Sequence, residues 1–572
     1  MSRISELPRR AWKDDAGPFV DRLSDLLRAP GGSQQLRLAQ AGCLLELAAA
    51  RPTRRRGQVI NGRVGIGKTL ALALAARVVG AQRPLIVTLG GILKETKGHV
   101  DSTRRDWQVP ADIVFTSYTA LGNLPRKGLD LRSFWHGLDP DFVGCDEVDK
   151  LANISAACSQ MVAEWRERCP EAWFLPVTAT CDVEGLPSYA HTMAWALGED
   201  SPLPLDRDDI EAWSEVIDKG NMLHSAGVCV DLGIPRSSTL PQIRAAFRER
   251  LHSAPGVIID DTPFTGVPLT FQSHALDVGL EDEFVKLRVL GQKADGLDVL
   301  PDDDSDEAGE DDPDPEQPDR VLNGQIGETA RQYGRGFFYK MDPPAPADWL
   351  AARRSYFSWV RAQLQARSFK TEAQARAWAD ETGLPRYLRW AAIKDSFVPQ
   401  HRTVWLTRKT LQWAGDWAAR NPHGIIWTEH PAVGLELERM TGLTYYGSRG
   451  YSAAGKYIEA APKGQPIIAS RRANSVGRNL QYKWNCMLFL QPLGKSRLLE
   501  QAAGRVHREG IETWSSEVRA DVLLCCSEDV RAVAKTLASA ERTCSSIYSQ
   551  KAATCEWGHV SDADLPQTTA FC

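Results

Sequence analysis

The chain has 572 residues, of which 43% are hydrophobic, 25% charged and 8% aromatic. The length exceeds what one hydrophobic core usually serves, and the composition is that of soluble globular domains, which excludes fibrous, collagen-like and globally disordered proteins. No stretch has the length of an apolar membrane span, and no apolar core follows the charged N-terminus as it would in a secretory signal. The twelve cysteines have no regular spacing, so we expect reduced thiols and a cytoplasmic protein.

The net charge of −5 is concentrated in one acidic tract. Eleven carboxylates and no lysine or arginine lie between Asp302 and Asp319, and the rest of the chain carries +6. A mildly basic remainder permits a polyanionic partner without requiring one. The tract has too little apolar surface to fold, so we expect a disordered loop or linker over residues 301–319. A DNA-mimicking segment that folds over a basic groove is the alternative.

Two parts of the chain alternate short apolar runs with helical segments, the pattern of parallel sheets flanked by helices. We expect one α/β block over residues 36–275, after an N-terminal extension of residues 1–35, and a second over 401–530, before a C-terminal tail of residues 531–572. Residues 276–400 are expected to form a helical insertion that carries the acidic tract. The predicted strands are Gln58–Ile60, Pro84–Thr88, Ile113–Thr116, Phe142–Cys145, Trp173–Val177, Gly424–Thr428, Pro466–Ser470, Cys486–Leu490 and Val522–Cys525.

A glycine-rich segment follows the first predicted strand and matches G-x-x-x-x-G-K-[ST], the phosphate-binding loop. Its glycines, which let backbone N–H groups approach phosphate oxygens, are Gly62, Gly65 and Gly67. Lys68 would place a positive charge against the β- and γ-phosphates, and the Thr69 hydroxyl can bind Mg²⁺. An Ala/Leu-rich helical pattern follows, as this loop requires. The segment predicts an ATP or GTP site.

Four residues with the sequence D-E-V-D, Asp146–Asp149, follow the predicted strand Phe142–Cys145. Open α/β sheets bind their ligands at the carboxyl ends of their strands. Asp146 is therefore a candidate for holding Mg²⁺ through water, and Glu147 for orienting and deprotonating an attacking water. A solvated acidic turn is the alternative, which the phosphate loop upstream disfavours.

The segment Q-A-A-G-R-V-H-R near the C-terminus places Gln501, Arg505 and Arg508 at positions i, i+4 and i+7, one face of a predicted helix. Two guanidiniums and an amide on one side suit a phosphoryl transition state, whose charge is spread over three oxygens. If they act on a nucleotide bound by the first block, hydrolysis depends on closure of the two blocks. A basic helix face that packs against solvent or the acidic tract is the alternative.

Taken in order over about residues 36–515, these segments resemble the motifs of superfamily 2 helicases, in the SWI/SNF-like branch. The matching segments are Leu36–Gln40, Gly62–Thr69 (motif I), Asp146–Asp149 (motif II), Thr178–Thr180 (motif III), Ser475–Gln481 (motif V) and Gln501–Arg508 (motif VI). Asp149 stands where the family more often has a histidine. Segments 336–350, 425–430 and 445–447 are similar to phage-encoded helicases of the DEAD/DEAH type.

The resemblance implies an α/β fold with two RecA-like P-loop NTPase lobes and an ATP-dependent DNA helicase or translocase in a bacterial or phage-infected cytoplasm. Mg²⁺ and ATP would be its cofactors, bound between the lobes. Gln40 would contact the adenine, Gly477 would contribute from motif V, and Gln501, Arg505 and Arg508 would complete the site. The resemblance implies single-stranded or duplex DNA as partner, with RNA not excluded, no membrane, and partners in DNA replication or recombination.

Contacts to nucleic acid are predicted less sharply. Candidate phosphate contacts are Lys94, Lys97, Thr116, Ser117, Tyr118, Arg471 and Arg472. Scattered surface charge and helix-capping hydroxyls are the alternative for each. Aromatic residues crowd the insertion, where they would form a helical core or a wedge that stacks on bases; they are Trp349, Phe357, Trp359, Trp378, Trp390 and Trp405.

Other functions stay open at this point. A duplex translocase that does not separate strands, or the motor subunit of a restriction-type complex, would use the same motifs. A nucleotide-gated binding protein is a third possibility, although it predicts degraded catalytic residues. A zinc site is not expected, because the spacing of the C-terminal cysteines and histidine fits no standard pattern; these residues are Cys544, Cys555, His559 and Cys572.

Overall fold

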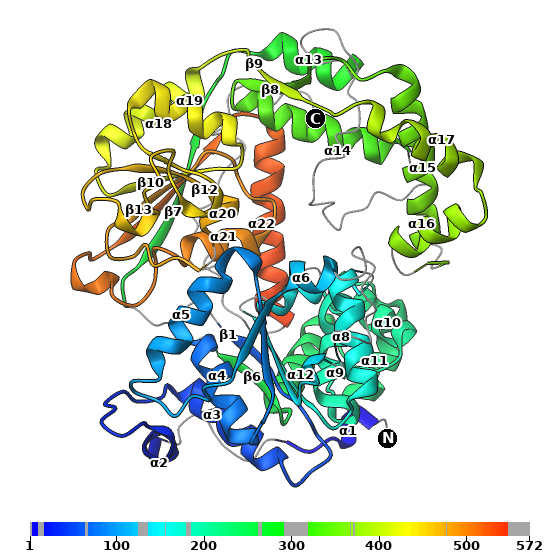
Figure 1. Cartoon of the computed structure of the whole chain (residues 1–572), viewed down its shortest axis with the longest axis vertical. Helices are drawn as coiled ribbons and strands as arrows, with labels where there is room; N and C mark the ends of the chain where they lie inside the picture. Colours follow the sequence, from blue (N-terminus) through cyan, green and yellow to red (C-terminus); the bar gives the residue numbers. More distant parts are fainter. Residues whose placement is uncertain are drawn as a thin grey trace. The chain divides into compact units, whose positions relative to one another are not determined.

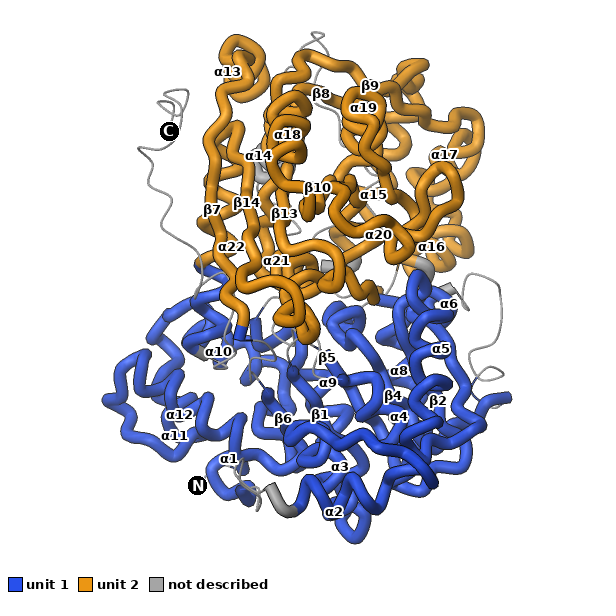
Figure 2. Tube along the Cα trace, turned by 90° about the vertical axis from the view of Figure 1, so that its left-hand side faces the viewer, with its two compact units in different colours: residues 1–266, 538–555 blue, residues 267–537, 556–572 orange. Residues whose placement is uncertain are grey.

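The computed structural model of the chain has two compact units. The described residues are 3–9, 17–62, 67–123, 135, 137–154, 156–178, 185–260, 266–290, 318–365, 368–369, 372–475 and 477–546. Unit 1 consists of Met1–Gly266 and Ala538–Cys555, and unit 2 of Val267–Leu537 and Glu556–Cys572 (Figure 2). Each unit has a six-stranded parallel sheet flanked by helices, so the predicted α/β class is confirmed.

The sheet of unit 1 has the strand order β3-β2-β4-β5-β1-β6. Its strands are β1 (Val59–Gly62), β2 (Pro84–Thr88), β3 (Val114–Ser117), β4 (Phe142–Asp146), β5 (Trp173–Thr178) and β6 (Val257–Asp260). Five of them were predicted, with ends that agree within two residues. Strands β1, β2 and β4 are buried on both faces, which is why they read as continuous apolar runs, whereas the edge strand β3 is partly exposed.

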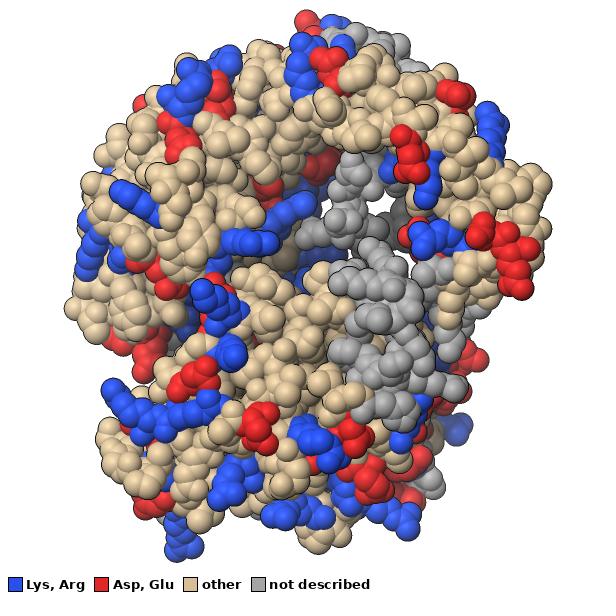
Figure 3. Space-filling model, viewed as in Figure 1, with Lys and Arg blue, Asp and Glu red and all other residues tan. Residues whose placement is uncertain are grey.

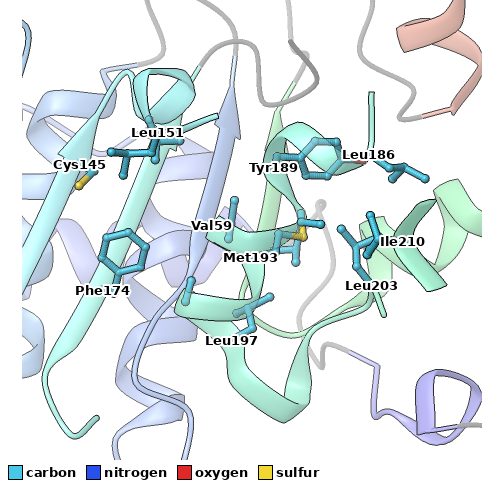
Figure 4. Close-up of a cluster of buried hydrophobic side chains, with 14 of the residues drawn as sticks. Val59, Cys145, Leu151, Phe174, Leu186, Tyr189, Met193, Leu197, Leu203 and Ile210 are labelled. Carbon is cyan, nitrogen blue, oxygen red and sulfur yellow. The ribbon is translucent and has the colours of Figure 1, made fainter. Parts of the chain in front are cut away.

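Helices cover both faces of this sheet (Figure 1). They are α1 (Arg3–Glu6), α2 (Gly17–Leu27), α3 (Leu38–Ala50), α4 (Lys68–Val79), α5 (Leu93–Thr103), α6 (Tyr118–Asn123), α8 (Ala157–Arg168), α9 (Pro187–Leu197), α10 (Arg207–Ile217), α11 (Ser225–Leu232) and α12 (Leu240–Ser253). Successive strand residues point to opposite faces, so Val59 packs in one core and Ile60 in the other. Figure 4 shows the first core, where Met193 and Leu197 of α9 lie near Val59.

The sheet of unit 2 has the order β11-β12-β10-β13-β14-β7. Its strands are β7 (Leu269–Ala275), β10 (Gly424–Thr428), β11 (Tyr445–Tyr446), β12 (Ile467–Ser470), β13 (Cys486–Phe489) and β14 (Val518–Leu524). Strand β7 pairs with β14 along its whole length, from Leu269 opposite Val518 to Ala275 opposite Leu524. The predicted end of the first block at residue 275 is therefore wrong, because this strand completes the second sheet.

The helices of unit 2 are α13 (Glu281–Leu290), α14 (Pro318–Gly334), α15 (Ala347–Gln365), α16 (Glu372–Glu381), α17 (Pro385–Ile393), α18 (Lys409–Arg420), α19 (Pro431–Thr441), α20 (Arg471–Asn474) and α21 (Ser496–Ala503). Helix α22 (Ser527–Ser546) belongs to unit 2 up to Leu537 and to unit 1 from Ala538. Strands β8 (Phe337–Met341) and β9 (His401–Trp405) form an antiparallel pair. The predicted insertion over 276–400 is not one body. Its first part packs in the core of the second sheet, through residues such as Phe284 and Tyr333, whereas α15 and α17 share a small core of their own.

The acidic tract lies outside the described residues up to position 317, and its last two residues begin α14. The nine cysteines within the described ranges are free thiols. No helix in the described part of the chain combines the length and apolar character that a bilayer crossing requires.

Candidate functional site

Three neighbouring strands of unit 1 bring the predicted motif residues to one edge of the sheet. Strand β5 lies between β1 and β4, and all three are parallel. Val177 of β5 is level with both Ile60 and Asp146. Because adjacent strands are about 4.8 Å apart, the ends of β1 and β4 lie about 10 Å from each other. The phosphate loop and the D-E-V-D turn thus leave the sheet at its carboxyl edge, two strands apart.

Helix α4 begins at Lys68, immediately after a left-handed residue, Gly67, with φ 80° and ψ 36°. The Lys68 side chain is buried, and its Nζ donates a hydrogen bond to the Gly62 carbonyl oxygen at 3.0 Å. The lysine therefore folds back over the loop from the first turn of the helix. Thr69 follows it in that turn, half-buried. Gly65 lies outside the described residues. The described ends of the loop fit a phosphate site, because a helix N-terminus and an ammonium group lie together.

Gln40 of α3 packs against the junction between this loop and α4. Its Nε2 donates to the Gly67 carbonyl oxygen at 3.1 Å, and its Oε1 accepts from the Arg37 N–H at 2.9 Å. A Cβ atom on Gly67 would lie 2.1 Å from Gln40 Nε2, far inside contact distance. The structure thus brings Gln40 to the phosphate loop and assigns it a structural contact there. Its predicted contact with adenine stays a prediction.

The turn after β4 has an unusual backbone. Asp146 ends the strand and is buried, and Glu147 has φ 55° and ψ 56°, the left-handed region that side chains other than glycine rarely adopt. Glu147 is 7% exposed, and its Oε2 atom has no hydrogen-bond partner among the described residues. A strained residue with an unsatisfied buried oxygen, held at the end of a strand, is the kind of outlier that marks a functional position.

Two side chains from outside the motifs support this turn. The Tyr118 hydroxyl, at the start of α6, donates to the Asp146 carbonyl oxygen at 2.8 Å. Burial raises the pKa of Tyr118 well above its usual value, so the hydroxyl stays a donor. On the other side, His191 of α9 lies 2.6 Å through Nε2 from the carbonyl oxygen of Leu151, which ends the 3₁₀ turn Val148–Leu151. Burial lowers the pKa of His191, which favours the neutral ring.

The residues of unit 1 that were predicted to contact phosphate differ in their exposure to solvent. Tyr118 is buried, and its hydroxyl donates to the Asp146 carbonyl oxygen, so its predicted contact with nucleic acid is wrong. Ser117 is also buried, and its Oγ accepts from the Ala120 N–H at 3.1 Å, as a helix-capping hydroxyl does. Thr116 is half-buried. Lys94 and Lys97 are exposed on α5 and remain candidates. On the face drawn in Figure 3, lysine and arginine are interspersed with aspartate and glutamate, so charge alone does not mark one binding surface there.

In unit 2, the predicted motif VI helix is shorter than expected. Helix α21 contains the buried Gln501 but ends at Ala503, and the backbone then tightens, with the Arg505 N–H donating to the Ala502 carbonyl oxygen at 3.2 Å. The three side chains therefore do not share one helix face, and that prediction is wrong. Arg505 Nε donates to the Ser475 carbonyl oxygen at 2.7 Å. Arg508 Nη1 lies 3.4 Å from the carbonyl oxygen of Arg478.

These contacts join motif VI to motif V within unit 2. Gly477, in motif V, has φ 72°, which suits a glycine. Arg471 was predicted to contact phosphate, but its buried guanidinium is paired with Glu429, with Nη2 2.8 Å from Oε2. That prediction is wrong for Arg471, because its charge is already neutralised inside the unit. Arg472 is exposed and remains a candidate.

The aromatic residues of the insertion are mostly core. Trp349 and Trp390 are buried in the small core of α15 and α17, with ring centroids 5.1 Å apart. Phe357 and Trp359 pack against the same core. Trp378 is 42% exposed and stacks on Trp359. Trp405, on β9, packs against the core of the second sheet. The core interpretation is confirmed for the two buried tryptophans.

Mg²⁺ usually binds through one or two protein oxygens, several waters and the phosphates of a nucleotide. Among the described residues, no group of three or more His, Cys, Asp or Glu side chains could hold a metal ion by itself. The predicted roles of Thr69 and Asp146 at a nucleotide-bound Mg²⁺ stay predictions. Of the zinc candidates that the spacing disfavoured, Cys555, His559 and Cys572 lie outside the described residues.

Neither protein-family models nor curated proteins match this sequence. The assignment of the site therefore depends on the motif order and on the geometry described above.

Proposed function

We propose that this chain is an ATP-dependent motor of the superfamily 2 helicase type, with two RecA-like lobes, that couples ATP hydrolysis to movement along DNA or to its unwinding. One observation carries the proposal: the phosphate loop and the D-E-V-D turn lie at the carboxyl edge of one parallel sheet, on strands that flank β5. Order in the sequence alone does not require this juxtaposition. The lysine, the carboxylates and both motif VI arginines are all present.

The residues of unit 1 have separate roles in this proposal. The phosphate loop and Lys68 bind the nucleotide phosphates, and Thr69 and Asp146 hold Mg²⁺, which neutralises phosphate charge when bound. Glu147 orients the attacking water and accepts its proton; its buried Oε2 has no competing hydrogen bond among the described residues. The sharp turn at Glu147 fixes the direction of this carboxyl group. Gln40 keeps the junction of loop and helix in place through Gly67.

The residues of unit 2 supply positive charge in this proposal. The bond from Arg505 Nε to Ser475 fixes the orientation of the guanidinium. We propose that Arg505, Arg508 and Gln501 stabilise the phosphoryl transition state when the lobes close on ATP, with Gly477 in the adjoining loop. If hydrolysis requires residues of both lobes, it occurs only when the lobes are closed, so each cycle of hydrolysis is coupled to a movement of the lobes.

The proposal is tested by measuring ATP hydrolysis by the purified full-length protein alone and with single-stranded DNA, duplex DNA or RNA. Glu147→Gln is the control, since it keeps the size of the side chain and removes the base. Stimulation by a polymer that disappears in the variant supports a motor and identifies its track. Stimulation by duplex alone favours a translocase or a restriction-type motor over a helicase. Absence of hydrolysis under every condition refutes the proposal and favours a nucleotide-gated binding protein.

A further inference from the structure

A tightly folded loop between β11 and β12 presents basic and aromatic side chains to solvent. The loop, residues 447–457, reads G-S-R-G-Y-S-A-A-G-K-Y and contains two basic residues and no carboxylate. Arg449, Tyr451 and Lys456 are exposed, Tyr451 by 50%. Backbone hydrogen bonds close the loop, from the Gly447 N–H to the Tyr451 carbonyl oxygen at 3.0 Å and from the Ser452 N–H to that of Lys456 at 2.9 Å.

The backbone of the loop is strained at Arg449, and the next residue packs closely against the buried side chains of Asn474 and Arg478. Arg449 has φ 55°, in the left-handed region. The next residue, Gly450, is buried, and a Cβ atom there would lie 2.9 Å from Asn474 Oδ1 and 3.1 Å from Arg478 Nη2. Such strain persists only where the surroundings fix the backbone, and it is concentrated at functional sites. The conformation of Arg449 and Gly450 is therefore determined by the residues beneath them.

Arg478 of motif V is the main support beneath the loop. It is 1% exposed, and its Nη2 donates to the Arg449 carbonyl oxygen at 2.9 Å. Its Nη1 donates to the Tyr457 hydroxyl, and the guanidinium carbon lies 4.9 Å from the centroid of that ring. The Tyr457 ring in turn contacts Tyr451, with 5.2 Å between centroids. A buried cation thus connects motif V to the exposed ring of the loop.

On its other side, the backbone of motif V is held by the motif VI arginines. Arg505 Nε donates to the Ser475 carbonyl oxygen at 2.7 Å, and the Leu480 N–H donates to the Arg505 carbonyl oxygen at 3.1 Å. Arg508 Nη1 lies 3.4 Å from the carbonyl oxygen of Arg478. All these contacts lie within unit 2. Contacts therefore run from the exposed ring of Tyr451, through Tyr457 and Arg478, to Arg508. Arg505 contacts Ser475 and Leu480, which flank Arg478 in motif V.

We propose that the 447–457 loop binds a single-stranded stretch of polynucleotide, with a base stacked on Tyr451 and phosphates beside Arg449 and Lys456. We propose also that Arg478 is a positioning residue that transmits occupancy of the loop to Arg505 and Arg508. An exposed ring between cations, without a carboxylate in the loop, has the chemistry of a stacking platform beside an anionic backbone. The first part concerns binding alone, whereas the second rests on the proposed ATPase function.

The binding part is tested without nucleotide, by fluorescence anisotropy of a labelled oligothymidylate with the full-length protein. Tyr451→Ala, which removes the stacking ring, and Arg449→Ala, which removes a positive charge beside the phosphates, are each expected to weaken binding about tenfold. Tyr451→Phe, which keeps the ring, and Arg420→Ala, which removes an exposed arginine from α18, are the controls and should bind as the wild type does. The Arg449→Ala variant should also show a smaller dependence on salt.

The binding part is overturned if the wild type does not bind the oligonucleotide or if the alanine variants bind it as tightly as the controls do. It is overturned equally if polyglutamate displaces the oligonucleotide from the wild type as well as unlabelled oligothymidylate does, because the loop would then recognise acidic polymers in general.

The positioning part is tested by steady-state hydrolysis with Arg478→Lys and Tyr457→Phe. We expect kcat with saturating polymer to fall about tenfold in Arg478→Lys, with KM for ATP changed less than twofold, and to fall less in Tyr457→Phe, which loses only the hydroxyl contact. The ratio of stimulated to unstimulated rates should therefore drop. An equal loss of both rates would mean a merely structural role and overturns the inference, and Tyr457→Phe decides the question if Arg478→Lys does not fold.

The two proposals fail in different ways. If the wild type binds oligothymidylate through the loop but never hydrolyses ATP, the proposed function and the positioning part fail while the binding part stands. If hydrolysis is stimulated by polymer yet loop variants behave like the controls, the inference fails and the proposed function stands.

Discussion

The strained turn at Glu147 predicts that removing this carboxyl group will raise stability while it abolishes activity. Glu147 is buried, its Oε2 has no hydrogen-bond partner among the described residues, and its backbone is left-handed. An unsatisfied buried polar atom costs about 1–3 kcal/mol, and a non-glycine residue in this backbone region about as much. A protein keeps two such costs at one residue when that residue is needed for function.

Two substitutions separate these costs. Glu147→Gln keeps the backbone and replaces a carboxyl group by a neutral amide, so we expect about 1 kcal/mol of added stability, or an increase in Tm of about 2–4 °C for a unit of this size. Glu147→Asn should add to this, because asparagine adopts left-handed conformations more readily than glutamate. Both variants should lose ATP hydrolysis by about a hundredfold or more, since each lacks the base.

Differential scanning calorimetry of the full-length protein without nucleotide, paired with a hydrolysis assay, checks the expectation. Glu167→Gln, at an exposed position near the C-terminal end of α8 in the same unit, is a matched control that makes the same chemical change at a solvated position. A fall of 2 °C or more in Tm for Glu147→Gln, without a fall for the control, would show that the carboxyl group is satisfied in solution and would refute the argument from strain.

Three further changes test other parts of the structure. Gly67 has φ 80°, and a Cβ atom there would lie 2.1 Å from Gln40 Nε2, so Gly67→Ala should abolish binding of a fluorescent ADP analogue and lower Tm. Adding Gln40→Ala should remove the steric clash and recover part of the Tm loss, but the left-handed backbone of an alanine should still cost about 1 kcal/mol. Burial lowers the pKa of His430 to about 4, so between pH 6.5 and pH 4 the unfolded chain binds a proton at this residue that the folded chain does not bind. The free energy of unfolding should therefore fall by about 3 kcal/mol as the pH falls from 6.5 to 4. His430→Asn should make Tm depend less on pH in that range. The buried Arg335 lies 2.7 Å from the Asp529 carboxylate. Asp529→Ala leaves this guanidinium without its ion pair and should lower the free energy of unfolding, measured by thermal unfolding, by about 3–5 kcal/mol. The double variant Asp529→Leu with Arg335→Met should lose less, because it leaves no buried charge.

The strands could be predicted where burial on both faces leaves an apolar run. The nine predicted strands are all present, although β14 begins four residues before its predicted start at Val522. The alternating pattern of Leu269–Ala275 is local, but its partner β14 lies about 250 residues later, and nothing local tells which sheet a strand joins. Strand β11 has only two residues, Tyr445 and Tyr446, too few for any periodicity. The predicted boundary at residue 275 is misplaced because the sequence of Leu269–Ala275 does not indicate that this strand joins the second sheet.

The candidate site could be predicted where chemistry is local to a motif. Lys68, Asp146 and Glu147 are named by loop spacing and by their position after a strand, and the structure places them at one sheet edge. The role of Tyr118 could not be predicted, since the sequence indicates a hydroxyl near a strand end but not that it turns inward to the Asp146 carbonyl. His191 carried no signal at all, because its function depends on where α9 packs.

The left-handed turn at Glu147 has supports on both sides within unit 1. Left-handed strain is kept only when neighbouring contacts over-determine the backbone. Here the contacts come from Tyr118, in the helix after β3, and from His191, in the helix after β5. The Tyr118 contact is to the residue before Glu147, and the His191 contact is to Leu151, four residues after it, so both sides of the turn are anchored to helices of this unit. The backbone of the Glu147 turn is thus held, through two hydrogen bonds to backbone carbonyls, by segments that lie outside the D-E-V-D sequence itself.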